Sequence, residues 1–142
     1  MPTVKEVLND TKKRLKEQGI DTYSLSSLLV SEVTGLTKIQ LVTHDRDEVT
    51  EEQLNILENL VKERLKNKPM QYILGHCEFM GLDFKVTENT LIPRGDTENI
   101  VEEVIATIEN SGYNTVLDMC TGTGAIAISV AHYTKAKVTA SD

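Results

Sequence analysis

The sequence predicts an all-α N-terminal domain, then a β-hairpin linker, then the start of an α/β domain of the nucleotide-binding type. Three observations support this order. Capped helical patterns fill the chain up to Pro69, an alternating pattern follows at 77–86, and a strand, a glycine-containing turn and a helix begin at Thr115. The predicted domains are 1–68 for the helical domain, 69–95 for the linker and 96–142 for the incomplete α/β domain.

Composition limits the kinds of protein that this chain can be. Its two cysteines, Cys77 and Cys120, stand far apart and give no disulfide framework, which favours a reducing, cytoplasmic compartment. No apolar run approaches the roughly 20 residues that span a bilayer, and the charged N-terminus is unlike a signal peptide. The three histidines have no metal-ligand spacing, so we expect no metal site.

The net charge of −7 is unevenly distributed along the chain. Residues 1–75 hold 11 Lys and Arg against 12 Asp and Glu, whereas residues 76–142 hold 4 against 10. Neither half carries a basic stripe, so the sequence disfavours direct binding to nucleic acid and favours a protein partner or a small cationic ligand. The alternative is that the charge only keeps the chain soluble.

Two capping boxes predict the first and the last helix of the helical domain. Thr3 and Glu6 cap a helix over 3–18. Thr50 and Gln53 have the same spacing and cap another helix. In both, apolar residues recur on one face. The residues expected to point inward are Val4, Val7, Leu8 and Leu15 in the first helix, and Leu54, Leu57, Val61 and Leu65 in the last.

Between them the pattern predicts two shorter helices. One begins at Asp21 and ends at Gly35, with Leu25, Leu28, Leu29 and Val33 inward. Thr37 caps the next, which contains Ile39, Leu41 and Val42.

Beyond Pro69 the pattern changes from helical to alternating. Apolar and charged residues alternate in 77–79 and in 82–86, and Met80-Gly81 is the turn between them, which predicts a β-hairpin. A lone hairpin is marginal in water, so we expect it to pack against a neighbouring domain. A helix then follows, capped by Asp96 or Thr97. Its expected buried residues are Ile100, Val101, Val104, Ile105 and Ile108, and its expected exposed residues are Glu102, Glu103 and Glu109.

The most informative stretch begins with a buried parallel strand over 115–119, which breaks into the turn Gly122-Thr123-Gly124 before a helix-like pattern. Glycines let the backbone approach a ligand closely, and the helix N-terminus offers unpaired N–H groups to an anion. Asp142 follows a second strand-like run over 136–140, where a carboxylate can accept hydrogen bonds from both hydroxyls of a ribose. This order predicts half of a nucleotide-binding βαβ unit.

Two chemistries fit this motif. A dinucleotide site of the NAD type uses the spacing Gly122-x-Gly124-x-x-Ala127, with the pyrophosphate on the helix N-terminus. A class I S-adenosylmethionine-dependent methyltransferase uses a similar loop with an additional acidic residue at the end of the first strand, where this chain has Asp118. A carboxylate there suits an ammonium and a sulfonium and repels a pyrophosphate. The motif therefore favours the methyl donor, and a turn without a ligand is the third interpretation.

Three further motifs precede this loop. They are Pro69-Met70-Gln71-Tyr72-Ile73-Leu74-Gly75, then Phe79-Met80-Gly81-Leu82-x-Phe84-x-Val86, then Leu91-Ile92-Pro93-Arg94-x-Asp96-Thr97-Glu98. With the run from Asp118 to Ala127, they closely resemble the linker and the first cofactor motif of the HemK/PrmC-type release-factor glutamine N5-methyltransferases. The resemblance extends from about Pro69 to Asp142, and the helical domain has the expected size and place.

The resemblance implies an enzyme that transfers a methyl group from S-adenosyl-L-methionine to the side-chain amide of the Gln in the Gly-Gly-Gln motif of peptide chain release factors. It implies that the helical domain helps to grip the release factor and that 96–142 begins a class I methyltransferase domain. The implied cofactor-binding residues are Cys120, Thr121, Gly122, Thr123 and Gly124 around the methionine part, Asp118 at the amino-acid end and Asp142 at the ribose hydroxyls.

Each implied role has a structural alternative. For Asp118 the alternative is a strand-end residue bonded to nearby backbone N–H groups, and for Asp142 it is a disordered terminus. Arg94, Asp96, Thr97 and Glu98 either line the pocket or only cap a helix and complement its charge.

The chain departs from the family in two places. Gly95 stands where family members commonly have Pro, which loosens the presentation of Arg94. No Asn-Pro pair occurs, so the family's substrate-binding Asn-Pro-Pro-Tyr motif is absent, and no catalytic residue is assigned.

We therefore expect an inactive fragment in which residues 1–68 fold stably, while the segment after about 110 is frayed, rearranged or paired with another chain. The alternative functions are a class I methyltransferase acting on an amino group of nucleic acid and a non-catalytic module that binds release factors.

Overall fold

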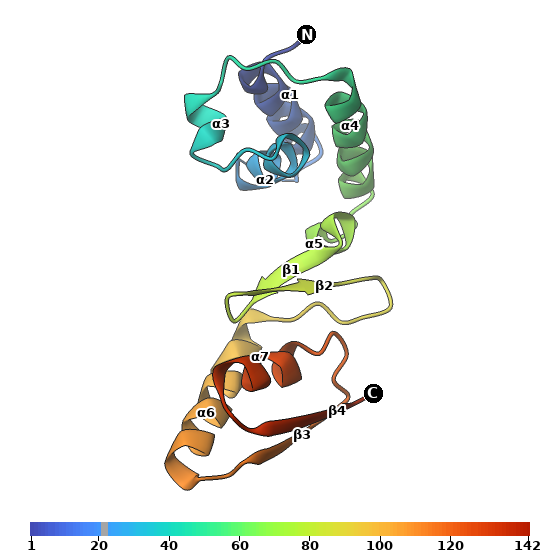
Figure 1. The fold of residues 1–142 in the computed structure, drawn as a ribbon. Coiled ribbons are helices and arrows are strands. Elements are labelled where there is room, and N and C mark those ends of the chain that lie inside the picture. Colours follow the sequence, from blue (N-terminus) through green and yellow to red (C-terminus); the bar gives the residue numbers. More distant parts are fainter. Residues whose placement is uncertain (21–22) are drawn as a thin grey trace. The chain divides into compact units, whose positions relative to one another are not determined.

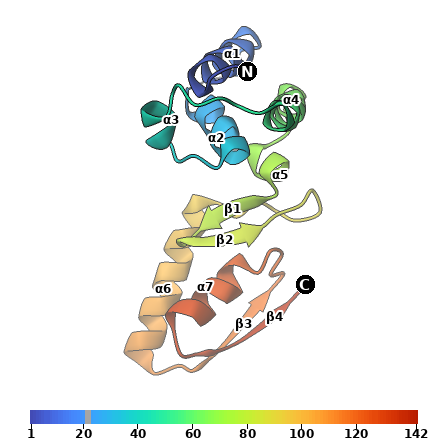
Figure 2. The same ribbon diagram turned by 45° about the horizontal axis from the view of Figure 1, so that its top comes forward.

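The computed structural model describes residues 1–20 and 23–142 and divides into two compact units, Met1–Ile73 and Leu74–Asp142 (Figures 1 and 2). The division lies inside the segment that the sequence assigns to the linker, and the hairpin belongs to the second unit. The helices are α1 (Val4–Glu17), α2 (Tyr23–Thr34), α3 (Gln40–Thr43), α4 (Glu51–Leu65), α5 (Met70–Leu74), α6 (Gly95–Ser111) and α7 (Ala125–Tyr133), and the strands are β1 (His76–Phe79), β2 (Leu82–Lys85), β3 (Thr115–Met119) and β4 (Lys137–Ser141).

Both predicted capping boxes are confirmed in the first unit. The Thr3 hydroxyl accepts from the Glu6 N–H at 3.4 Å, and the Thr3 N–H donates to the Glu6 carboxylate at 2.8 Å. Thr50 and Gln53 exchange the same pair of bonds at 3.2 and 3.0 Å. Two orphan donors at the start of each helix are thus satisfied by side chains that stand three residues apart.

The inner faces of the first unit follow the predicted spacing. Val4, Val7 and Leu15 of α1 are buried, as are Leu57 and Val61 of α4. The predicted start of the second helix at Asp21 lies outside the described residues, and the described part ends at Thr34, just before Gly35. The remaining buried apolar side chains of the unit are Leu29, Val30, Leu41, Val49 and Met70.

Helix α3 is shorter than the sequence suggests. Thr37 and Gln40 exchange hydrogen bonds of the capping type, at 2.9 and 3.3 Å, but the helix begins only at Gln40 and leaves Ile39 before it, exposed. Helix α5 was not predicted. It begins directly after Pro69, whose carbonyl accepts from the N–H groups of Tyr72 and Ile73. Proline is favoured at the start of a helix, which fits Pro69 before α5. Helix α4 has already ended at Leu65, with Asn67 in the left-handed region at φ +63°.

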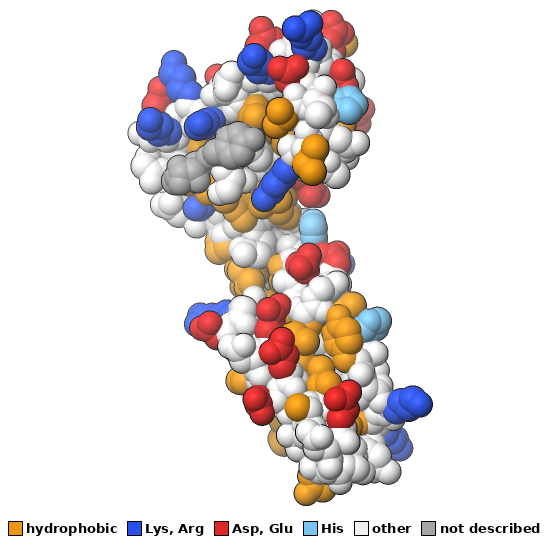
Figure 3. Space-filling model, turned by 90° about the vertical axis from the view of Figure 1, so that its left-hand side faces the viewer, with side chains coloured by type: hydrophobic (Ala, Val, Ile, Leu, Met, Phe, Trp, Pro, Cys, Tyr) orange, Lys and Arg blue, Asp and Glu red, His pale blue; other side chains and the backbone are white. Residues whose placement is uncertain are grey.

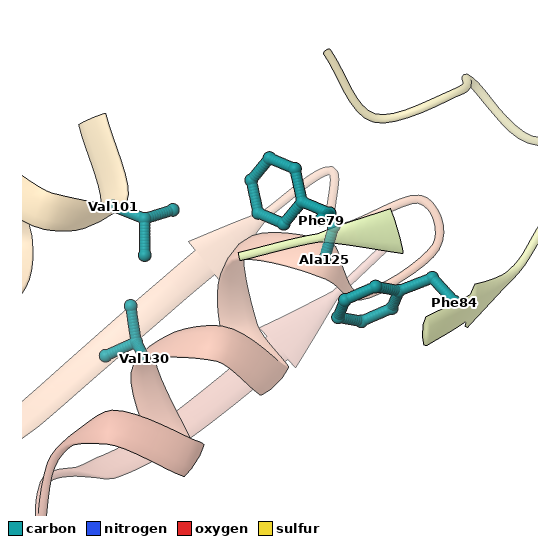
Figure 4. Close-up of a cluster of buried hydrophobic side chains, with 5 residues drawn as sticks. All are labelled: Phe79, Phe84, Val101, Ala125 and Val130. Atoms are coloured by element: carbon teal, nitrogen blue, oxygen red, sulfur yellow. The ribbon is translucent and has the colours of Figure 1, made fainter. Parts of the chain in front are cut away.

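The predicted hairpin is confirmed, with Cys77 opposite Phe84 and Phe79 opposite Leu82. Both turn residues have positive φ, +52° at Met80 and +71° at Gly81, as in the type I′ turn that suits the strand twist. The hairpin packs on the rest of the second unit, and Figure 4 shows Phe79 and Phe84 around Ala125 of α7. The two phenylalanine rings meet edge to face, with their centroids 6.1 Å apart.

Helix α6 begins earlier than predicted. Arg94 is its N-cap and makes no side-chain capping bond, so the expectation that Asp96 or Thr97 caps the helix is wrong. The chain already turns at Arg94, whose carbonyl accepts from the Thr97 N–H at 3.0 Å. Asp96 therefore lies within the first turn, where its charge complements the helix dipole.

One predicted core residue of α6 is exposed. Val101 is fully buried and faces Val130 of α7 (Figure 4). The other predicted inward residues, Val104, Ile105 and Ile108, pack against the same cluster. Ile100 is 58% exposed, and its predicted burial is wrong. In this unit α6 packs against other elements on one side only. Its apolar stripe is wider than that contact, and Ile100 lies outside it.

The strand, turn and helix of the glycine motif form as predicted. Strands β3 and β4 pair in parallel, with Val116 opposite Val138 and Asp118 opposite Ala140, and α7 connects them. The rearranged alternative for this segment is wrong. The expectation that β3 is a buried strand is also wrong, because Leu117 is 60% and Met119 is 70% exposed, on a face that none of the described elements covers.

The surface of the second unit therefore combines apolar and acidic groups. Figure 3 shows acidic side chains around a strip of apolar side chains on this unit. Among the described residues, no helix is both long enough and apolar enough to cross a bilayer.

Candidate functional site

The candidate site begins at the loop between β3 and α7. Cys120, Gly122 and Gly124 all have positive φ, at +61°, +55° and +78°. Three such residues in five positions fold the loop back on itself at the end of the strand, and glycine adopts this backbone without a steric cost. Gly124 is also the N-cap of α7, so the loop leads the chain directly into the helix.

Asp118 holds the loop against the helix. Its Oδ2 accepts from the Thr121 hydroxyl at 2.7 Å and from the Ala127 N–H at 3.1 Å. These bonds match the interpretation of Asp118 as a strand-end residue bonded to nearby donors. The other oxygen, Oδ1, makes none of the hydrogen bonds found among the described residues, so one side of the carboxylate stays available to a ligand.

Asp142 lies beside the same loop. Its Oδ1 accepts from the Gly122 N–H at 3.3 Å, and the Thr121 N–H donates to the Ser141 carbonyl at 3.0 Å. The carboxyl ends of parallel strands meet at one edge of a sheet, which brings Asp118 and Asp142 to the two sides of one loop. The structure describes Asp142 as ordered and not as a disordered terminus, because its side chain is bonded to the Gly122 N–H.

A cavity of about 230 Å³ lies between this loop and the segment that leads into α6. The loop contributes Cys120, Thr121, Gly122 and Thr123, and the facing segment contributes Arg94 and Thr97 together with Leu91, Ile92 and Pro93. Phe79 of the hairpin and Ala125 and Ile126 of α7 complete the lining. The sequence left open whether Arg94, Asp96, Thr97 and Glu98 line a pocket or only cap a helix. Arg94 and Thr97 line the cavity, whereas Asp96 and Glu98 do not.

Glu98 has a different partner. Its carboxylate accepts from the Met80 N–H at 2.8 Å, and the Tyr133 hydroxyl donates to the Met80 carbonyl at 2.6 Å. Helices α6 and α7 therefore hold both backbone groups of the hairpin turn residue, next to Phe79 in the cavity wall. Sequence reasoning missed this contact, and only the place of Glu98 in the linker motif drew attention to it.

The start of α7 offers donors to a ligand. Among the hydrogen bonds of the described residues, none uses the N–H groups of Ala125 or Ile126, and both residues line the cavity. Unpaired N–H groups in the first turn of a helix bind anionic groups such as a carboxylate. The loop thus brings together backbone with positive φ, N–H donors at the start of α7 and the carboxylate that follows β4.

Comparison with known proteins places this geometry in a family. The sequence model described as PrmC N-terminal domain matches residues 6–75. The release factor glutamine methyltransferase of Clostridium acetobutylicum is 41% identical over 133 residues, which are 93% of this chain and 47% of that protein. The enzyme of the same name from Moorella thermoacetica is 37% identical over 142 residues, 99% of this chain and 50% of its own length.

A more distant relative gives the same result. The release factor glutamine methyltransferase of Borreliella burgdorferi is 33% identical over 140 residues, or 98% of this chain and 47% of that protein. The chain spans about half the length of the curated relatives it matches. With the matched N-terminal domain, the strand–loop–helix unit and this similarity along nearly the whole chain, the protein belongs to the family of the release factor glutamine methyltransferases.

Proposed function

We propose that this chain is the helical domain and the first part of the cofactor domain of a methyltransferase that acts on peptide chain release factors. In this proposal the methyl group of S-adenosyl-L-methionine is transferred to the side-chain amide of the Gln in a Gly-Gly-Gln motif. The observation that carries it is the cavity between the 120–126 loop and Arg94, in a chain whose relatives are named for this activity.

The cofactor supplies an electrophilic methyl group on a sulfonium, and the residues of this chain bind and orient it. The backbone of Gly122 and Gly124 would lie against the methionine part, because glycine has no side chain to keep a ligand away. The free N–H groups of Ala125 and Ile126 suit the cofactor carboxylate, and the unbonded oxygen of Asp118 suits its ammonium. Asp142 would accept hydrogen bonds from the ribose hydroxyls.

The size of the cavity bears on what this chain does by itself. Pockets for small ligands typically measure about 300–1,000 Å³, and this one measures about 230 Å³. The described residues therefore enclose one side of the ligand. An amide nitrogen is a weak nucleophile, so methyl transfer depends on groups that hold it at attack distance. We propose that this chain binds the cofactor weakly and does not catalyse transfer by itself.

A thermal-shift experiment tests the cofactor assignment. The chain is heated with S-adenosylmethionine, S-adenosylhomocysteine or NAD, and a ligand at 100 times its dissociation constant adds about 2.7 kcal/mol to the native state. We expect a rise in Tm with the two adenosyl ligands only. Asp142→Ala should reduce this rise, whereas Glu109→Ala, an exposed carboxylate of α6 outside the cavity, should not. A rise with NAD alone would refute the proposal.

A further inference from the structure

The helical unit contains a second and larger cavity, which the proposed chemistry does not use. It has a volume of about 470 Å³ and lies between α1 and α4. Its apolar lining comes from Val7, Leu54 and Leu57, and charged side chains from both helices surround these. It shares no lining residue with the cavity beside the 120–126 loop.

The walls of this cavity, here called the α1–α4 groove, are fixed before any ligand arrives. A capping box fixes the first turn of each helix. Across the groove, Arg14 donates from Nη1 to Glu58 Oε2 at 2.7 Å and from Nη2 to Glu58 Oε1 at 3.1 Å. A bidentate guanidinium–carboxylate pair fixes the relative position of two helices. A preorganised groove loses little conformational entropy when a partner binds.

The lining of the groove carries excess negative charge. Its lining holds three carboxylates, those of Glu6, Asp10 and Glu58, and one cation, Arg14, whose guanidinium is engaged by Glu58. Lys62, outside the lining, also lies 3.6 Å from Glu58, so the accessible negative charge is that of Glu6 and Asp10. Hydrogen bonds from Thr3 lower the pKa of Glu6, and the hydrogen bond from Arg14 lowers the pKa of Glu58, so both stay ionised at neutral pH. Asp10 is 66% exposed and lies 3.9 Å from Arg14, which leaves its carboxylate accessible.

We propose that the α1–α4 groove binds a basic amphipathic segment of the substrate protein. An apolar side chain of that segment enters between Val7, Leu54 and Leu57, and a Lys or Arg side chain reaches the carboxylate of Asp10. The negative lining excludes nucleic acid as the occupant, because phosphates are repelled. The identification of the partner as the methylated release factor rests on the proposed function, whereas the chemistry of the segment rests on the groove alone.

The chemistry is tested first with peptides. The isotope-labelled chain is titrated with two helical peptides that share their apolar residues and carry either Lys or Glu at the charged positions. We expect the Lys peptide to shift the amide signals of Val7, Thr11 and Leu54, and to bind at least tenfold more tightly than the Glu peptide. Equal binding of the two peptides, or shifts that avoid the groove, would overturn the proposal.

Two variants and one control make the test specific. Asp10→Lys reverses the accessible charge, and Asn55→Trp fills the groove without changing any charge; both should weaken the Lys peptide at least tenfold. Glu17→Lys makes the same charge change on α1 outside the groove and should bind like the unchanged chain. Asp10 and Asn55 are exposed, so circular dichroism should report unchanged folding for these variants. If Asp10→Lys and Glu17→Lys behave alike, the groove is not the binding site.

The same variants are then measured against a purified bacterial release factor. We expect at least a tenfold loss of affinity with Asp10→Lys and none with Glu17→Lys, while S-adenosylmethionine binding is the same in all three chains. Unchanged binding of the release factor by Asp10→Lys would refute this role of the groove. The proposed function fails by a different result, namely absent adenosyl-ligand binding in the unchanged chain, so the two failures are distinguishable.

Discussion

At the scale of single residues, Met80 is the point where hairpin and helices meet. Its φ of +52° is costly for a side chain with a Cβ, and glycine or asparagine is the usual residue of such a turn. The structure compensates by bonding both backbone groups of Met80, the N–H to Glu98 and the carbonyl to Tyr133. The hairpin is thereby fixed with Phe79 in the wall of the cavity beside the 120–126 loop.

Loss of the Glu98 carboxylate should therefore destabilise the second unit. A hydrogen bond to a charged group contributes roughly 1.5–3 kcal/mol, and this one is only partly buried. We expect Glu98→Ala to lower the free energy of unfolding by about 1–2 kcal/mol, and Glu98→Gln, which keeps an acceptor, by less than half of that. Chemical denaturation measures both. Glu102→Ala, on the exposed face of the same helix, is the control and should stay within about 0.5 kcal/mol of the unchanged chain. A Glu98→Ala chain as stable as Glu102→Ala would contradict the role of this bond.

Gly124 and Gly112 allow backbone strain to be separated from ligand binding. Both have left-handed φ, +78° and +69°, so alanine at either should cost about 1–2 kcal/mol. A Cβ at Gly124 meets the exposed side chain of Ile128, Cδ1 at 3.0 Å and Cγ1 at 3.5 Å, whereas one at Gly112 meets nothing within 4 Å. We expect similar losses of stability in denaturation experiments but a loss of S-adenosylmethionine binding in Gly124→Ala alone, measured by calorimetry. Equal cofactor affinity in the two variants would argue against the loop as the binding site.

These residues also mark the limit of prediction from the sequence. Asp118 and Asp142 are identified by their spacing from the glycines, since strand, loop and helix follow one another in the chain. The bonds of Glu98 and Tyr133 to Met80 join residues 18 and 53 positions apart, and no local pattern announces them. The inward bonds of Asp118 were foreseen only as one of two interpretations.

At the scale of elements, the sequence predicts the start of a helix correctly where the contacts that form this start are local. A capping box needs residues only three positions apart, so the starts of α1 and α4 follow from the sequence. Helix α6 begins instead through backbone turning at Arg94, and a sequence rule that requires a polar cap places its start too late. The burial of Ile100 and of strand β3 was overestimated, because burial depends on which layers cover a face.

The pair of Arg14 and Glu58 predicts a pH dependence of the helical unit. The folded pKa of Glu58 is lowered by the hydrogen bond from Arg14, so the pair stabilises the unit above the unfolded pKa of Glu, about 4.3. This contribution is lost as the pH falls through the folded pKa. Both side chains are partly exposed, which limits the contribution to roughly 0.5–1 kcal/mol.

Glu58→Gln should therefore flatten the acid side of the stability curve. Denaturation at several pH values is expected to show the variant less stable than the unchanged chain at pH 7, with the difference vanishing at low pH. Asp45→Asn, whose carboxylate lies 3.8 Å from the exposed Lys5, serves as the control and should leave the curve nearly unchanged. A constant difference between Glu58→Gln and the unchanged chain across all pH values would show that the effect is not electrostatic.

At the scale of the whole molecule, the two units differ in how well they cover their apolar residues. The first unit surrounds Leu15, Leu29 and Val61 with helices, and all three are fully buried. In the second unit β3 and β4 form a two-stranded sheet whose uncovered face exposes Leu117 and Met119. A small sheet with one open face is only marginally stable in water, so opening of the second unit should cost less free energy than opening of the first.

Hydrogen exchange of the monomeric chain measures this difference directly. We expect the amides of Leu15 and Val61 to exchange at least tenfold more slowly than those of Val116 and Val138, because the two strands pack against the core of their unit on one face only. Saturating S-adenosylhomocysteine should slow exchange at Val116 and Val138 and leave Leu15 and Val61 unchanged, since a ligand stabilises only the unit that binds it. Equal protection of both units in the free chain would mean that the sheet is more stable than its exposed face indicates. Ligand-induced protection confined to the helical unit would instead move the cofactor site away from the 120–126 loop.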